Sequence, residues 1–117
     1  MKENIIKNKS FDFALSIVKL YKYLIDLKKE YVISKQLLRS GTAIGALVRE
    51  SEHAESKADF IHKLSISLKE ANESDYWLEL LFRSNYIDEK QFNAYKIDIE
   101  EILKLLVSII KTSKGSK

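Results

Sequence analysis

The stretch that decides the fold lies near the end of the chain, where residues 89–112 read EKQFNAYKIDIEEILKLLVSIIKT. Asp88 precedes this stretch, and together with Gln91, three residues later, it has the spacing of a capping box. The large apolar residues of the stretch follow strict heptad spacing, which is typical of a helix with one buried face: Phe92, Tyr95, Ile99, Ile102, Leu106 and Ile109. We therefore predict an amphipathic helix over about residues 89–112.

Towards the start of the chain, apolar residues continue to recur at helical spacing. The chain has no proline and only three glycines, so little interrupts a helix in its interior. We predict three more helices, over about residues 57–84, 35–54 and 11–29, with N-caps at Ser56, Ser34 and Ser10. Short connections place consecutive helices antiparallel. The predicted fold is all-α, an up-down-up-down antiparallel four-helix bundle that forms a single domain over residues 1–117.

The composition agrees with this fold and excludes several classes of protein. The 117 residues are 45% hydrophobic and 32% charged, which is enough for one buried core. The absence of cysteine excludes disulfide scaffolds, thiol nucleophiles and cysteine-ligated metal sites. No apolar run approaches the ~18 residues of a membrane span, and the polar start lacks the apolar core of a signal peptide. We expect a soluble, cytoplasmic protein.

Two glycines stand out because they lie inside the second predicted helix. Gly41 and Gly45 are one turn apart, and a glycine inside a helix costs roughly 0.5–1 kcal/mol relative to alanine. Close packing against another helix is the simpler reason for them. A ligand or partner subunit that approaches the backbone is the alternative.

A carboxylate also falls on the apolar seam of the third predicted helix. Asp75 has the same heptad position as the large apolar residues there, and a buried carboxylate needs a partner. The candidates are Arg39, Lys35 and Lys90.

The helices carry more apolar surface than a monomeric bundle needs. The first predicted helix has two apolar stripes instead of one. The third adds large side chains outside its main seam, which we assign to an oligomer interface: Phe60, Tyr76, Trp77, Leu80 and Leu81. A wide intramolecular face with singly exposed aromatic residues is the alternative.

Two Glu-x-x-His-like patterns raise the question of a metal site. They are Glu50 to His53 and Asp59 to His62, which flank the turn between the second and third helices. Neither histidine lies on the main apolar seam of its helix, so we predict solvated histidines and no metal. The serines are typical of caps and solvent-facing positions, and no nucleophile elbow is present. We predict no catalytic residue, no cofactor and no enzymatic activity.

The formal net charge of +3 is concentrated at the two ends of the chain. Met1–Lys9 contains three lysines against one glutamate, whereas residues 10–110 are slightly acidic, and we expect both ends to be mobile. We predict nucleic-acid contacts at two places, the loop end of the bundle and the C-terminal tail: Lys28, Lys29, Lys35 and Arg39, and Lys111, Lys114 and Lys117. Ordinary solvated lysines are the alternative.

The second and third helices also carry a more specific pattern. It consists of SKQLLRSGTAIGAL at residues 34–47, RES at residues 49–51 and KEANESDYWLELL at residues 69–81. Over nearly its whole length, the chain resembles the four-helix-bundle proteins of the 23S rRNA intervening-sequence protein family. It departs from the family at Leu47, where asparagine is usual, and at Arg49, where a small residue is usual.

The resemblance implies a cytoplasmic bacterial four-helix protein that assembles into a ring-like homopentamer. It places Arg39, Glu50 and Glu73 at the charged positions of the family, and for these and for Asp75 we expect structural ion pairs. It brings no catalytic residue.

A relative, the accessory variability protein of diversity-generating retroelements, associates with a reverse transcriptase and nucleic acid, so the resemblance implies RNA, DNA or such a protein as partners. We expect a non-enzymatic homo-oligomeric scaffold or adaptor associated with nucleic acid. A purely structural oligomer or protein–protein interaction module without nucleic-acid binding is the alternative.

Overall fold

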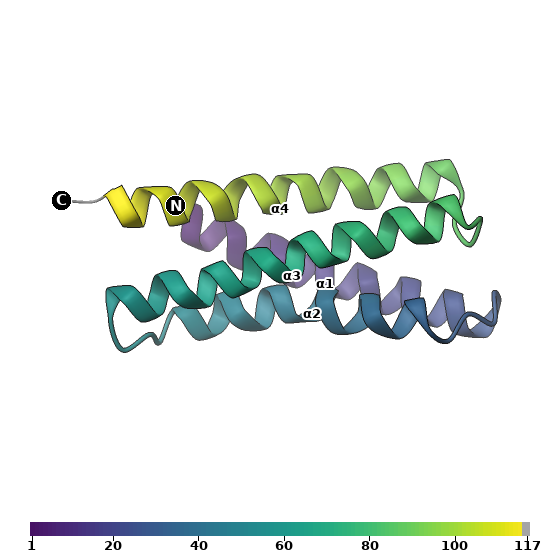
Figure 1. Cartoon of the computed structure of the whole chain (residues 1–117), viewed down its shortest axis with the longest axis horizontal. Helices are drawn as coiled ribbons and strands as arrows, with labels where there is room; N and C mark the ends of the chain where they lie inside the picture. The colour runs from purple at the N-terminus through teal and green to yellow at the C-terminus, as the bar shows by residue number, and fades with distance from the viewer. Residues whose placement is uncertain (116–117) are drawn as a thin grey trace.

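The computed structural model describes residues 1–115 and contains four helices in an up-down-up-down bundle (Figure 1). They are α1 (Lys2–Asp26), α2 (Ile33–Ser51), α3 (Lys57–Arg83) and α4 (Glu89–Gly115). Each helix packs against its neighbours in sequence, and α4 closes the bundle against α1. The molecule measures 50 × 22 × 19 Å, and both chain termini lie at the same end. The predicted fold class is confirmed.

The core follows the heptad spacing of the sequence. In α1 the buried positions are Ile6, Ser10, Phe13, Ile17, Leu20 and Leu24. In α4 they include Ile99, Ile102, Leu106 and Ile109. Because the buried stripe of α1 begins at Ile6, the helix begins at Lys2, and the predicted start after Ser10 is wrong. Ser10 is fully buried inside α1, where its hydroxyl donates to the carbonyl of Lys7 at 3.2 Å.

The starts of α3 and α4 lie at the predicted residues 57 and 89, and apart from the start of α1 the other helix ends differ from prediction by one to three residues. Helices α1 and α2 end at Asp26 and Ser51, each three residues earlier than predicted, and α4 continues to Gly115. Both charged ends are helical where the structure describes them, so the expectation of mobile tails is wrong for Lys2–Lys9 and for residues 111–115. Lys117 lies outside the described residues.

Two of the predicted N-caps are confirmed. The Ser56 hydroxyl accepts from the backbone N–H of Asp59 at 3.0 Å. Asp88 and Gln91 form a reciprocal capping box, with distances of 2.7 and 2.9 Å between side-chain oxygen and backbone nitrogen.

The predicted cap at Ser34 is wrong, because the start of α2 is capped by a residue from the preceding connection. The Glu30 carboxylate accepts from the backbone N–H groups of Val32, Ile33 and Ser34 at 2.6–3.1 Å. Burial alone raises the pKa of Glu30, but these bonds and the Ser34 side chain outweigh it and hold the pKa below its usual value. Glu30 therefore stays charged at the positive end of the α2 dipole.

The two glycines of α2 allow α1 to approach closely. A Cβ at Gly41 would lie 3.0 Å from two carbon atoms of Ile17, and one at Gly45 would lie 3.3 Å from the carbonyl oxygen of Ser10. Their role is the close helix packing that the sequence suggested.

Candidate functional site

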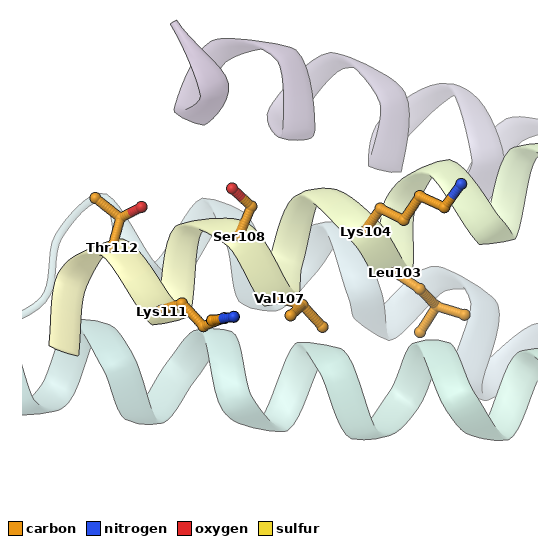
Figure 2. Close-up of a pocket in the computed structure, with 6 residues that line it drawn as sticks. All are labelled: Leu103, Lys104, Val107, Ser108, Lys111 and Thr112. Atoms are coloured by element: carbon orange, nitrogen blue, oxygen red, sulfur yellow. The ribbon is translucent and has the colours of Figure 1, made fainter. Parts of the chain in front are cut away.

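A basic surface lies on the C-terminal half of α4. An open groove of about 520 Å³ is lined by Leu103, Lys104, Val107, Ser108, Lys111 and Thr112. Figure 2 shows Lys104, Ser108 and Thr112 on one side of α4 and Leu103, Val107 and Lys111 on the other. The Lys2 ammonium donates to the Ser108 hydroxyl at 2.5 Å, which brings a further cation from α1 to this surface.

This part of α4 contains no neutralising acid. Residues 102–117 carry four lysines and no aspartate or glutamate. Lys104, Lys111 and Lys114 are exposed, and none of them takes part in an ion pair within residues 1–115. In Figure 1 the last turns of α4 extend past the start of α1. These ammonium groups are thus fixed on an ordered helix and accessible to an anion.

The second predicted group of cations lies at the opposite end of the bundle, where α1 connects to α2. Lys28, Lys29 and Lys35 are exposed there, and the Lys28 ammonium lies over the Tyr23 ring at 5.9 Å. Lys29 takes a left-handed backbone conformation with φ 55°, which helps to reverse the chain after α1. The Glu30 carboxylate lies among them, so this end is less strongly positive than the C-terminal half of α4.

Arg39 does not belong with these lysines. Its guanidinium forms ion pairs with Glu70, at 3.3 Å, and with Glu73. Both carboxylates come from α3, so Arg39 ties α2 to α3 and is less available to a nucleic acid.

The other residues predicted to form ion pairs also have partners. Glu50 lies 3.5 Å from Lys63, and Asp75 lies 2.8 Å from Lys96. The hydrogen bond that the Lys96 ammonium donates to Asp75 is the main reason that the pKa of Lys96 is raised. Lys96 was not among the predicted partners of Asp75, because the pairing depends on the rotation of α4 against α3, which sequence spacing does not show.

The predicted oligomer interface on α3 is only partly at the surface. Leu81 is wrong as an interface residue, because it is fully buried in the core of its own bundle. Phe60 and Trp77 are partly buried against that core, and the Trp77 indole nitrogen has no hydrogen-bond partner within residues 1–115. Leu80 is half-buried, and Tyr76 is 61% exposed. The extra aromatic residues of α3 thus mostly widen the intramolecular core.

Large apolar side chains are also exposed on α1. Phe11 and Leu15 on α1 are 50% and 51% exposed. Phe11 borders a groove of about 590 Å³ between α1 and α2, which also includes Ala14, Thr42 and Ala46. Phe11 and Leu15 were not among the residues predicted for an oligomer interface.

The two histidines, His53 and His62, are both exposed. Across residues 1–115, histidine, aspartate and glutamate side chains nowhere form a group of three or more able to hold a metal ion. Of the helices described, none is apolar enough over a sufficient length to span a membrane.

Comparison with known proteins gives a match to a family model and matches to solved structures. A family model described as 23S rRNA-intervening sequence protein matches residues 2–108. A crystal structure of a protein with unknown function from the S23 ribosomal protein family of Bacteroides thetaiotaomicron is 60% identical, with a TM-score of 0.95. The match covers 96% of this chain and 100% of that one. No curated protein matches the chain.

Proposed function

The chain belongs to the 23S rRNA-intervening sequence protein family, and from this membership we propose that it is a non-enzymatic homo-oligomer that associates with nucleic acid in the cytoplasm. In this proposal five copies form a ring, and the ring acts as a scaffold or adaptor. The proposal has three parts, which concern nucleic acid, oligomerisation and the absence of catalysis.

The observation that carries the nucleic-acid part is the acid-free, lysine-bearing half of α4. Lys104, Lys111 and Lys114 present three exposed ammonium groups along one ordered helix, and Lys2 lies beside them. Ammonium groups on such a surface bind phosphates by releasing condensed counterions, which requires no sequence-specific contact. The apolar stems and side chains between them, such as Val107, suit the sugar and base surfaces of a single strand.

The oligomeric part is supported by the apolar surface on α1 and by the benefit of repetition. Exposed large apolar side chains mark interaction surfaces when they gather, and Phe11 and Leu15 are both half-exposed on α1, with Phe11 at the edge of the groove between α1 and α2. In a ring the lysine surface is repeated on every copy. Weak contacts then act together on one nucleic acid, so the assembly binds more tightly than one chain does.

The non-enzymatic part is supported by how the polar side chains are used. Arg39, Glu50 and Asp75 are held in ion pairs between helices. The buried serines are engaged with backbone carbonyls or with each other, as Ser40 and Ser74 are at 2.9 Å. These groups hold the bundle together, which is a structural and not a catalytic use of them.

Fluorescence anisotropy with labelled single-stranded RNA tests the nucleic-acid part. We expect the unmodified protein to bind at about 50 mM salt and to lose affinity steeply towards 200 mM. The triple variant Lys104→Gln, Lys111→Gln, Lys114→Gln should bind at least about tenfold more weakly, with the log–log salt slope reduced by about 2.

A matched control is available at the other end of the bundle. The variant Lys28→Gln, Lys29→Gln, Lys35→Gln removes the same charge, and we expect it to keep most of the affinity. If this variant loses binding while the α4 variant keeps it, the assignment of the surface is wrong. No binding at about 50 mM salt by the unmodified protein contradicts a nucleic-acid function and leaves an oligomer that contacts proteins only.

A further inference from the structure

The groove between α1 and α2 is hollow because small residues line its floor. Ala14 comes from α1, and Thr42, Gly45 and Ala46 come from α2. Since side chains this small fill little space, the two helices leave a groove of about 590 Å³ although their backbones lie close together. Thr42 and Glu50, which both line the groove, lie eight positions apart on α2, about 12 Å at the rise of a helix.

One cation at this groove has no carboxylate partner. Lys7 and Glu50 also line the groove, but they are paired with Glu52 and Lys63, respectively. Arg49 takes part in no ion pair within residues 1–115, and its guanidinium lies 5.7 Å from the centre of the Phe11 ring. An arginine beside a half-exposed phenylalanine is the kind of pair that dominates protein interfaces.

A complementary surface is present on the same chain, on the N-terminal half of α4. Asn93, Ile97 and Glu100 are exposed and follow heptad spacing on the outer side of the helix. Ile97 is 60% exposed, although isoleucine is among the residues most often buried and the other isoleucines of α4 are buried. These residues form a seam that nothing in the chain covers among residues 1–115, and we call it the α4 seam.

The α4 seam has the opposite charge to the groove. Its charged residue is Glu100, whereas the cation of the groove without an ion pair among residues 1–115 is Arg49. Lys96 lies 2.8 Å from Asp75 but 3.9 Å from Glu100, so its main partner is Asp75. The Glu100 carboxylate is therefore available to a second cation.

We propose that the α1–α2 groove of one copy receives the α4 seam of a second copy. Ile97 enters the apolar floor beside Phe11, and Glu100 pairs with Arg49. Since the groove and the seam are different surfaces, the contact is head-to-tail, and a head-to-tail contact whose rotation closes generates a ring. The C-terminal half of α4 stays free for nucleic acid. This inference rests on the proposed oligomer and names its contact surfaces.

A charge swap tests the contact by light scattering during size-exclusion chromatography over a range of protein concentrations. Arg49→Glu and Glu100→Arg each place like charges together, so each should raise the concentration needed for assembly at least about tenfold. The double variant Arg49→Glu with Glu100→Arg should restore assembly, which also shows that the single variants are folded. Lys69→Glu, an exposed reversal on α3, is the matched control and should leave the mass unchanged.

The outcomes separate this inference from the proposed function. If the unmodified protein is an oligomer and both single variants keep its mass at all concentrations, the contact is wrong and the oligomer stands. If the single variants dissociate and the double variant does not recover, the pairing of Arg49 with Glu100 is wrong. If the unmodified protein has the mass of one chain, the oligomer and this contact both fall.

Discussion

The seam between α2 and α3 and the seam between α1 and α4 both join neighbouring helices, yet they are built differently. At the α2–α3 seam the contact runs through small buried residues. The Ser40 and Ser74 hydroxyls bond at 2.9 Å, and the Ser67 hydroxyl donates to the carbonyl of Ile44 at 3.0 Å. Among the four neighbouring pairs of helices, α2 and α3 make the most extensive contact.

The α1–α4 seam is the least extensive of the four. Between the two helices lies a hollow of about 140 Å³ lined by charged groups, among them Asp12, Asp98 and Glu101. Lys9 lines it too and pairs with Glu101 at 3.2 Å. Three carboxylates around one lysine leave the seam with excess negative charge.

The difference between the two seams leaves α2 closely packed and much of α4 exposed. Serine and glycine let α2 pack closely against both neighbours, which gives a rigid centre. Helix α4 is held mainly by α3, so its outer side and its last turns remain exposed. Both proposed contact surfaces of α4 lie on this less tightly packed side.

The largest expected effect comes from overfilling the α2–α3 seam. Ser74→Leu inserts a large side chain where none fits and removes the hydrogen-bond partner of Ser40, so we expect a loss of about 3 kcal/mol in the free energy of unfolding. Urea denaturation measures it. Ser108→Leu, at the partly exposed edge of α4 near α1, is the control and should change stability by about 0.5 kcal/mol or less. Equal losses in both variants would break the comparison of the two seams.

An intermediate effect is expected where α1 is tied to α2. Glu30→Gln removes the charge that caps α2 and should lower the free energy of unfolding by about 1–2 kcal/mol at pH 7. The pKa of Glu30 is lowered in the folded protein, so its contribution is fully present above the unfolded value of about 4.5 and is lost as pH falls through the folded value.

The difference between the variant and the unmodified protein should therefore shrink towards zero at strongly acidic pH. Urea denaturation at pH 7 and at progressively lower pH checks this. A difference that stays constant with pH contradicts a charge-based cap.

The smallest effect is expected at the α1–α4 seam, and it has the opposite sign. Burial and the nearby Glu101 raise the pKa of Asp98, so the charged form of Asp98 destabilises the fold above the unfolded pKa. Because solvent screens this exposed group, Asp98→Asn should stabilise the protein by only about 0.3 kcal/mol at pH 7. Thermal melts at low salt measure it, and destabilisation would show that Asp98 is needed at the seam.

The heptad spacing made the four helices predictable, because burial repeats with the period of a helix. The caps at Ser56 and Asp88 were also predictable, since they depend on residues only three positions apart. Ser10 misled the prediction because a serine at a helix start is typical of a cap. In the structure Ser10 lies against Gly45 of α2, where a small side chain allows the two helices to approach closely.

The candidate site was less predictable, because it depends, like the role of Ser10, on contacts between different helices. Lys111 and Lys114 were predicted as nucleic-acid contacts from charge alone, whereas Lys104 was missed because it lies inside the helix and not in a tail. Arg39 was predicted both as a nucleic-acid contact and in an ion pair, and it pairs with α3, whereas Leu81 was predicted at a surface and is buried. Each of these outcomes depends on how one helix is rotated against another.

The mass of the unmodified protein in solution tests the central claim most directly, since both proposed contact surfaces act in a homo-oligomer. Light scattering during size-exclusion chromatography measures that mass without assumptions about shape. The account predicts a particle with five times the mass of one chain. A particle with the mass of a single chain at high protein concentration would contradict it.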